Sequence, residues 1–221
     1  MAKRVVEEAS LVSVADSIRE RAGTSEPLVF PEGFKSAVEG IPDYGEQFVD
    51  GTITEYYHPT LTKTRQYGFC YCQKLTKVVL PELTAVAYFG FQHTEAMKEF
   101  VAPKVEKIAQ CGLSCSGFQV ADFPRLRQIG TEGFNWTPLM VLTLRRTDEM
   151  VTLSSVNGLS NTNISRGYGY IYAPRKFLSD TDASSDYRRA TNWSTYSTRF
   201  RVLEDYTVDG TTTGELDLSK I

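Results

Sequence analysis

Two stretches of the chain, YGFCYCQKLTKVVLPELTAV (residues 67–86) and YFGFQHTEAMKEFVAPKVEKI (residues 88–108), are one unit written twice. Seven positions of the first stretch, most of them apolar, recur 22 residues later in the second. They are Phe69, Leu75, Val78, Leu80, Pro81, Leu83 and Val86, followed by Phe91, Met97, Phe100, Ala102, Pro103, Val105 and Ile108. A fixed period of about 20–25 residues is typical of a solenoid, because one short unit cannot bury its apolar face alone.

The unit continues in both directions along the chain. After a one-residue deletion it returns as Leu113, Phe118, Ala121, Phe123, Pro124, Leu126 and Ile129. After 21 more residues it returns as Phe134, Leu139, Leu142, Leu144, Arg145 and Met150. Counting back by 22 residues from the first copy reaches Ile53, Tyr56, Pro59 and Leu61. The repeat therefore predicts about five stacked coils between residues 53 and 150.

Each full copy contains a short apolar run that ends in proline or, in the last copy, in arginine, as a short strand would. Proline has no N–H to donate to the next coil, so it fits only at the end of such a strand. We predict parallel strands near residues 76–80, 98–102, 119–123 and 140–144. The first apolar residue of each copy stands five or six positions before the next one, for example Phe69 before Leu75. These first residues, Phe69, Phe91, Leu113 and Phe134, are expected to form a buried central column.

The repeat resembles a known family. The spacing L-x-x-x-x-L-P-x-L is similar to leucine-rich repeats, and F-x-x-C-x-x-L-x-x-V-x-L-P, from Phe69 to Pro81, resembles the BspA-type branch. The resemblance implies an α/β repeat fold: a leucine-rich-repeat solenoid with short parallel strands, a small N-terminal helical segment and a C-terminal cap. It also implies a protein that binds other molecules through its repeats.

Length and composition limit the classes of protein to consider. The 221 residues, 41% of them hydrophobic, can bury a substantial core in one large domain or two small ones. The net charge is −3 with both signs interspersed, whereas a nucleic-acid-binding domain is normally clearly basic. No run of 18 apolar residues exists, and residues 1–20 are too acidic for a signal peptide. We therefore expect no nucleic-acid partner, no membrane insertion and no export by the usual route.

The repeat divides the chain into three predicted segments: residues 1–45, 46–160 and 161–221. The first is expected to contain two short amphipathic helices that are too small to fold alone and that dock on a neighbouring chain. Their apolar docking face would consist of Leu11, Val14, Ile18, Phe34, Val38 and Ile41. Because an exposed apolar patch of this kind usually marks an interface, other copies of the chain or other proteins of one assembly are the predicted partners.

Residues 161–221 are predicted to form a C-terminal cap and tail. The period breaks in a stretch rich in Ser, Asn and Gly, and the next strand-ending proline is Pro174. A helix over residues 187–190 and a lid of Trp193 and Tyr196 would then seal the end of the solenoid, as a repeat protein requires. The polar tail that follows is expected to be either an added strand or disordered.

No catalytic arrangement is recognisable in the sequence. The two histidines, His58 and His93, stand in no catalytic motif, and His58 is expected to be a half-buried residue at the end of a strand. No Walker sequence, HExxH, GxGxxG or nucleophile elbow is present. We predict that the protein is not an enzyme and needs no cofactor or metal.

The cysteines allow three interpretations: core residues, which the spacing favours, a disulfide, or a zinc site. C-x-C combined with C-x3-C matches no common zinc spacing, and the expected absence of export disfavours disulfides. Cys72 follows the core Phe69 by three residues and should fill a small buried slot. Its expected equivalents in the other copies are Thr94, Cys115 and Thr137.

A candidate binding site follows from the position just after each strand proline. In three successive coils this position is Lys104, Arg125 and Arg146. Coils stacked about 4.8 Å apart would bring these cations into a basic column, whose like charges repel unless an anion lies there. The alternatives are a solvated face with acidic neighbours such as Glu106 and Asp148, and contact with an anionic partner protein or a cell-wall glycan.

Two further stretches resemble structural and tail proteins of phages and prophages of Gram-positive bacteria. They are residues 15–41 and FVDGTITEY, residues 48–56, which opens the first repeat. This resemblance implies a virion structural protein of the tail, baseplate, fibre or particle surface, assembled in the host cytoplasm and contacting proteins or a host-surface glycan. The alternatives are a BspA-like adhesin on a bacterial cell surface and an intracellular protein-interaction module.

Overall fold

The computed structural model describes residues 51–179 and 182–221. The chain divides into two units, Met1–Asp43 and Tyr44–Ile221, and every described residue belongs to the second. The predicted docking segment therefore lies outside the described residues, and the docking role of its apolar face stays a prediction. This applies to Leu11, Val14, Ile18, Phe34, Val38 and Ile41.

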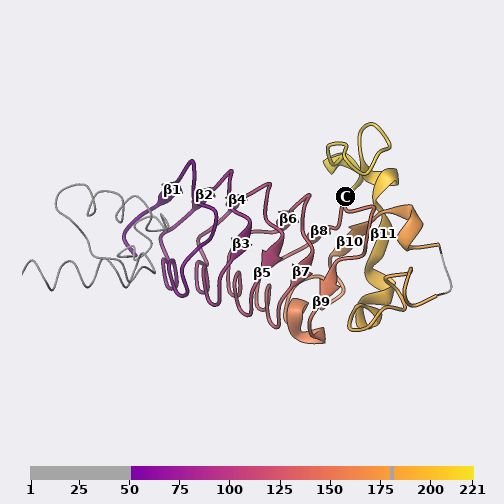
Figure 1. Ribbon diagram of the computed structural model, residues 1–221, viewed down its shortest axis with the longest axis horizontal. Coiled ribbons are helices and arrows are strands. Elements are labelled where there is room, and N and C mark those ends of the chain that lie inside the picture. Colours follow the sequence, from indigo (N-terminus) through magenta and orange to yellow (C-terminus); the bar gives the residue numbers. More distant parts are fainter. Residues whose placement is uncertain (1–50, 180–181) are drawn as a thin grey trace, which may run out of the picture. The chain divides into compact units, whose positions relative to one another are not determined.

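The described chain is a solenoid with one ladder of short parallel strands along its length (Figure 1). The members are β1 (Glu55–Tyr57), β2 (Lys77–Val79), β4 (Glu99–Val101), β6 (Val120–Asp122), β8 (Val141–Thr143), β10 (Tyr170–Ala173) and β11 (Phe200–Val202). Paired neighbours are parallel, and Tyr56, Val78 and Phe100 follow one another in register, as the 22-residue period requires. The predicted solenoid of short parallel strands is thereby confirmed, as are the four predicted strands, whereas the predicted N-terminal helical segment lies outside the described residues.

The ladder extends beyond residue 160. β10 pairs with β8, and β11 pairs with β10, both in parallel. β10 ends at Ala173, immediately before Pro174, so the strand-ending role predicted for this proline is confirmed. The segment predicted as a cap therefore contributes two further strands to the sheet before it closes the end.

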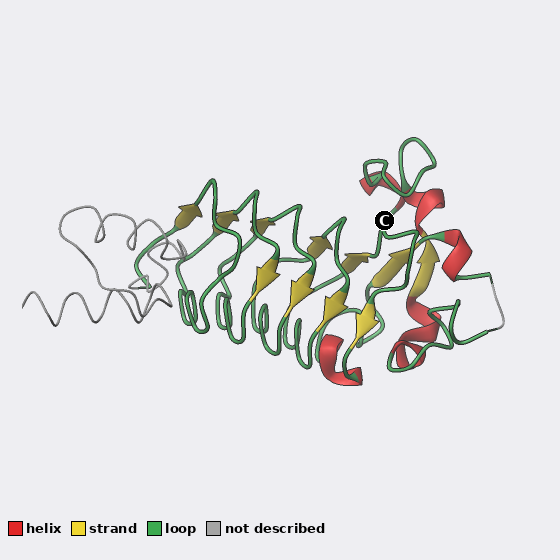
Figure 2. Cartoon of the chain, in the orientation of Figure 1, coloured by secondary structure: helices red, strands yellow, loops and turns green. Residues whose placement is uncertain are grey.

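A second parallel ladder, which the sequence analysis did not predict, has one strand after each of β2, β4, β6 and β8 (Figure 2). Its strands are β3 (Ala85–Val86), β5 (Lys107–Ile108), β7 (Gln128–Ile129) and β9 (Thr152–Leu153). Each has only two residues, and one of them is buried and apolar. In the fourth coil this residue is Leu153 and not Met150, as the repeat predicted, because the chain takes three more residues to return to the ladder there. The repeat positions Val86, Ile108 and Ile129 are thus strand residues that face the core.

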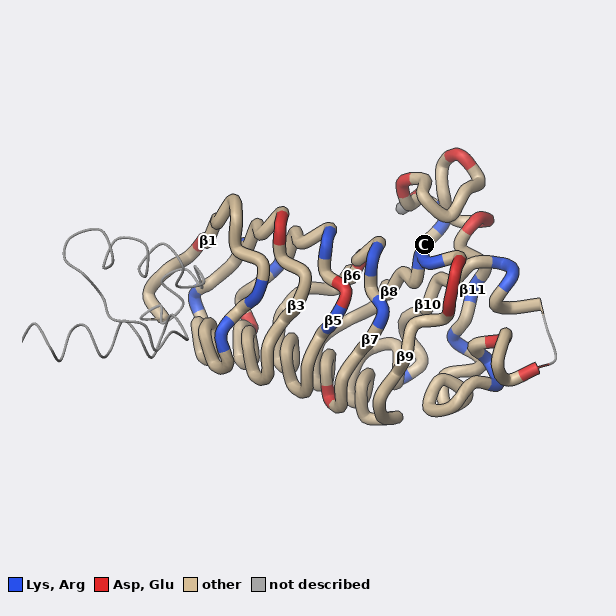
Figure 3. Tube along the Cα trace, in the orientation of Figure 1, with Lys and Arg blue, Asp and Glu red and all other residues tan. Residues whose placement is uncertain are grey.

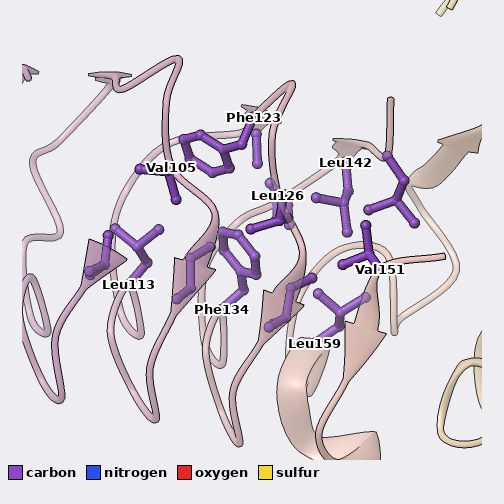
Figure 4. Close-up of a cluster of buried hydrophobic side chains, with 14 of the residues drawn as sticks. Val105, Leu113, Phe123, Leu126, Phe134, Leu142, Val151 and Leu159 are labelled. Carbon is purple, nitrogen blue, oxygen red and sulfur yellow. The ribbon is translucent and has the colours of Figure 1, made fainter. Parts of the chain in front are cut away.

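The centre of the solenoid is the predicted column of Phe69, Phe91, Leu113 and Phe134, each 0% exposed. The rings of Phe69 and Phe91 are stacked, with centroids 4.5 Å apart and planes 8° apart. Burying a side chain of this size contributes about 1.5–3 kcal/mol. The predicted burial of the column is confirmed, and the surrounding apolar side chains are drawn in Figure 4.

One coil exchanges its large and small core residues. The column has Leu113 where its neighbours have phenylalanine, and Phe118 stands where they have Leu75, Met97 and Leu139. The ring of Phe118 lies 6.2 Å from that of Phe134 in an edge-to-face arrangement. The exchange keeps the volume of the core nearly constant, which close-packed interiors require.

The one-residue deletion lies in this same coil and interrupts the first ladder. The strands form separate sheets on the two sides, β1-β2-β4 and β11-β10-β8-β6, whereas the second ladder is continuous. In the shortened turn, a Cβ placed on Gly117 would lie 1.9 Å from the carbonyl oxygen of Glu95. Only glycine permits this approach of two backbones.

The C-terminal cap is built from short 3-10 helices. They are η1 (Val156–Leu159), η2 (Arg175–Phe177), η3 (Trp193–Arg199), η4 (Leu203–Tyr206) and η5 (Leu218–Lys220). Trp193 is 2% exposed and donates its indole N–H to the Val151 carbonyl at 2.7 Å, and Tyr196 is 5% exposed. Both side chains are thus part of the buried core, and their role as a lid over the aromatic column stays a prediction.

The helix predicted over residues 187–190 is wrong, because this stretch forms turns. The carboxylate of Asp186 accepts a hydrogen bond from the Arg188 backbone N–H at 2.8 Å. The Tyr187 N–H donates to the Phe177 carbonyl at 3.0 Å. Such local side-chain bonds and a distant backbone partner compete with helical bonding.

The C-terminal tail folds back over the first ladder. Both side-chain contacts from Arg145 to Asp122, through Nε and Nη2, are 2.7 Å long. Its Nη1 also donates to the carbonyls of Thr212 and Gly214, each at 2.8 Å. An antiparallel bridge joins Thr207 to Leu216. Of the two outcomes predicted for the tail, the structure has the ordered one, although as a single bridge.

Candidate interaction surface

The predicted basic column is largely neutralised within its own coils. Lys104 Nζ lies 2.6 Å from a carboxylate oxygen of Glu82, which occupies the same position in the preceding coil. Arg125 is exposed. The pairing of Lys104 corresponds to the solvated-face alternative, and anion binding by the column stays a prediction.

Arg146, the third member of the column, is 7% exposed and surrounded by acids. It pairs with Asp148 and, through Nη1 at 2.5 Å, with Glu149. The hydrogen bond from Arg146 lowers the pKa of Asp148 to about 2. A buried guanidinium matched in this way stabilises its own turn and presents no cation for an external anion.

The cysteines and histidines form no site with recognisable chemistry within the described residues. All four cysteines lie there without a disulfide, and no cluster with metal-ligating side chains is found among these residues. His58 is half-buried at the end of β1, as predicted, and His93 Nδ1 lies 2.9 Å from a carboxylate oxygen of Glu95. Burial and a hydrogen bond to Glu132 raise the pKa of Cys111 to about 12, so this thiol is a poor nucleophile.

One slot assignment needs correction. Cys72, Thr94 and Thr137 are buried as predicted, but the equivalent residue in the shortened coil is Ser116. Ser116 is 1% exposed and lies 2.9 Å from the Thr94 hydroxyl, whereas Cys115 is half-buried in the preceding position. The deletion comes after this slot, so the 22-residue spacing still applies there.

A six-residue turn recurs at one edge of every regular coil. Its copies are YGFCYC (67–72), FGFQHT (89–94), CGLSCS (111–116) and EGFNWT (132–137), which we call the loop edge. The second residue is always glycine, the third is the core residue, and the sixth fills the small buried slot. The third and fifth N–H groups donate to the next coil at 2.8–3.1 Å, so backbone bonds continue along the edge.

The first and fifth residues of every copy have a left-handed backbone, with φ between 54° and 64°. The first positions are Tyr67, Phe89, Cys111 and Glu132, and the fifth are Tyr71, His93, Cys115 and Trp136. This conformation costs roughly 1–2 kcal/mol for ordinary residues and much less for glycine or asparagine. The edge therefore carries bulky side chains where the backbone alone favours small ones.

Three aromatic residues at the first and fifth positions of the loop edge project into solvent, whereas the phenylalanines at its third position are buried. Tyr67 is 47% exposed, Tyr71 is 61% exposed and Trp136 is 56% exposed. Tyr67 stacks on Phe89 with ring centroids 5.1 Å apart, and Tyr71 stacks on His93 with centroids 4.5 Å apart. Stacking of this kind is worth about 0.5–1.5 kcal/mol, so it offsets part of the backbone strain.

The loop edge is also nearly free of charge. Among its 24 residues only Glu132 is charged, whereas 23% of the whole chain is Asp, Glu, Lys or Arg. In Figure 3 the turns along the lower edge of the view are almost entirely tan, and charged residues concentrate nearer the strands and at the opposite side. An uncharged, aromatic surface beside a charged one is typical of a protein contact site.

Comparison with known proteins adds only a distant likeness. No family model matches the chain, and no curated protein matches it. Among solved structures, the chain is similar to a leucine-rich repeat protein from Bacteroides ovatus, at 19% identity and a TM-score of 0.40. That similarity covers 45% of this chain and 29% of the other, so the matched part is less than a third of that protein.

Sequence reasoning missed the loop edge although a signal was present. Gly68, Gly90, Gly112 and Gly133 recur immediately before the core column, and such a repeated glycine marks a tight turn. The aromatic residues next to these glycines were read only as part of the repeat.

Within the described residues no helix is long and apolar enough to cross a membrane.

Proposed function

We propose that this protein is a non-enzymatic protein-interaction module whose partner protein binds the loop edge. The observation that carries the proposal is the placement of Tyr67, Tyr71 and Trp136 at exposed, left-handed positions where small residues would cost less. Solenoids commonly present one side chain per coil to a partner, which turns a repeated turn into an extended surface.

The chemistry of the loop edge fits a protein partner. Tyrosine and tryptophan provide a large contact area while few rotatable bonds are ordered, and they are enriched among the residues that dominate binding energy. The stacked pairs Tyr67–Phe89 and Tyr71–His93 hold their rings in place before binding, which reduces the entropy that binding costs. The lack of charge lets the surface be desolvated cheaply.

Site-specific photocross-linking tests the proposal in the cell that produces the protein. A benzophenone amino acid replaces Tyr71 in the full chain, and the matched control carries it at exposed Arg125 in the predicted basic column. We expect a discrete cross-linked protein from position 71 and none from position 125. The same product should weaken when Trp136→Asn, three coils away on the same edge, is added.

The two positions also separate the two candidate surfaces. A discrete product from position 125 alone would contradict the loop edge and support the basic column. Equal, diffuse products from both positions would contradict a specific contact anywhere on the solenoid.

The placement of this module in a virion stays a prediction from sequence resemblance. The same holds for docking through residues 1–45 to copies of the chain or to other virion proteins, and for contact with a host-surface glycan. Particles that contain the protein, detected by mass spectrometry of a purified phage preparation, would favour the virion. Labelling of intact bacteria by a specific antibody would favour the surface adhesin.

A further inference from the structure

A concave site lies where the regular coils give way to the cap. A pocket of 490 Å³ opens between the wide coil after residue 155 and η3. Small-molecule sites typically have volumes of about 300–1,000 Å³. This pocket is large enough for a small organic ligand and lies outside the first three turns of the loop edge.

The pocket is lined by two arginines and by uncharged polar groups. The polar lining includes Arg166, Arg199, Asn157, Asn161, Ser160 and Thr195. None of its twelve lining residues is acidic, although the chain as a whole has a net charge of −3. The pocket therefore has a local positive charge that a small anion would neutralise.

These arginines differ from most others in the described chain. Arg127, Arg145, Arg146, Arg175 and Arg188 each form an ion pair with a carboxylate. Within residues 51–179 and 182–221, no ion pair involves Arg166 or Arg199. Both cations are thus available to an external anion, because no carboxylate of the protein lines the pocket.

Both guanidinium groups are held in position by their surroundings. The Cζ of Arg166 lies 5.7 Å from the ring centroid of Trp136, and that of Arg199 lies 5.5 Å from the ring of Tyr170. Nη1 of Arg199 also donates to the Gly167 carbonyl at 2.6 Å. A guanidinium stacked on a ring keeps edge N–H groups for a planar acceptor such as a carboxylate.

We propose that this pocket binds a carboxylate-bearing saccharide. Arg166 and Arg199 would bind the carboxylate. Asn157 Nδ2 would donate to a ring hydroxyl and Asn161 Oδ1 would accept from one, while Asn157 Oδ1 accepts from Ser160 and Asn161 Nδ2 donates to Asn135. Apolar lining from Val156 and Ile164 suits the C–H face of a sugar ring. The ligand is a small molecule and the residues differ from Tyr67 and Tyr71, so this site goes beyond the proposed protein contact.

The test is binding of glucuronate to the full chain by saturation-transfer NMR and calorimetry, with glucose and inorganic phosphate as the other probes. Glucuronate should bind at one site and at least about tenfold more tightly than glucose, because charge-assisted hydrogen bonds are worth that much. Phosphate should compete poorly because it has no ring whose C–H face could contact Val156 and Ile164 and no ring hydroxyls to donate to the amide oxygens. Equal binding of glucose, or phosphate binding as tightly as glucuronate, would overturn the proposal.

Matched variants locate the site. Arg166→Gln keeps an exposed polar side chain and should weaken glucuronate binding about tenfold or more. Arg199→Lys should also weaken binding, because lysine lacks the paired N–H groups with which a guanidinium binds a carboxylate. The control Arg189→Gln removes an exposed cap arginine outside the pocket and should change nothing, as should Tyr71→Asn on the loop edge. Wild-type affinity in Arg166→Gln, with unchanged circular dichroism, would refute the assignment. Because Tyr71→Asn tests the protein contact separately, failure of one proposal leaves the other measurable.

Discussion

Two pairs of rings in the same two turns have nearly the same geometry and opposite surroundings. Phe69 and Phe91 stack 4.5 Å apart with planes at 8°, and Tyr71 and His93 stack 4.5 Å apart with planes at 10°. The first pair is 0% exposed, whereas Tyr71 is 61% exposed. The spacing of the coils determines the geometry of both stacks, so the geometry alone does not show how much each stack contributes to stability.

The energetic difference comes from burial. Removing each inner ring from water contributes about 1.5–3 kcal/mol, and the outer stack gains only about 0.5–1.5 kcal/mol. The outer residues also carry the cost of a left-handed backbone, which Phe69 and Phe91 do not. The inner column therefore stabilises the solenoid, and the outer column is expected to contribute little net stability.

The largest expected effect is at the inner column. Phe91→Ala should lower the free energy of unfolding by about 3–5 kcal/mol, because it leaves a cavity between coils on both sides. Chemical denaturation of the full chain measures this loss. A loss below about 1 kcal/mol would contradict the column as the main source of stability.

A smaller effect is expected where the deletion brings two coils together. Gly117→Ala should destabilise by about 1–3 kcal/mol, because its Cβ would lie 1.9 Å from a carbonyl oxygen that cannot move without its coil. The matched control is Gly112→Ala, whose nearest neighbour is a Val86 methyl group at 3.0 Å. Thermal unfolding of both variants compares them, and equal losses would contradict the backbone explanation.

The inner column could be predicted from its own side chains, whereas only the repeated glycines pointed to the turns that carry the outer one. A buried position tolerates only apolar residues, so Phe69, Phe91, Leu113 and Phe134 left a periodic signal. The exposed positions of the loop edge tolerate Tyr, His, Cys or Trp and leave no such pattern. The second ladder escaped prediction because each of its strands has two residues, too few to show an alternation.

The candidate basic column shows a further limit of sequence reasoning. Its spacing was correct, and Asp148 was expected as an acidic neighbour, but the pairing of Lys104 with Glu82 and of Arg146 with Glu149 was not predicted. The pocket at the cap was equally hidden, because it joins the wide coil to η3 and both are irregular. Long-range pairs outside the period require the structure.

A pH-dependent loss of stability is expected at the exposed carboxylate of Asp148, which pairs with Arg146. The folded pKa of Asp148 is lowered from 3.8 to about 2 by its hydrogen bond with Arg146, so its ionised form favours the folded state. This contribution is fully present above pH 3.8 and is lost as the pH falls toward 2. Denaturation at several pH values should show it, and Asp148→Asn should remove that part of the pH dependence.

The same titration separates the inner column from the charged face. Phe91→Ala should lower the free energy of unfolding by the same amount at all these pH values, because the burial of an apolar ring does not depend on the ionisation of Asp148. High salt should reduce the effect of Asp148, since its side chain is 67% exposed and screening acts on exposed pairs. A pH dependence in Asp148→Asn as large as that of the unaltered protein would contradict this origin.

The smallest expected change in stability is at the outer column, and it decides the comparison. Tyr71→Asn removes the exposed ring but supplies a residue that adopts the left-handed backbone readily. The lost stack and the relieved strain should nearly cancel, so the free energy of unfolding should change by less than about 0.5 kcal/mol. Binding of the cross-linked partner should nevertheless fall, because the anchor ring is gone. Tyr71→Phe is the matched control and should keep both stability and binding. A large loss of stability in Tyr71→Asn would mean that the outer stack is structural, and the aromatic loop edge would then be explained without a partner.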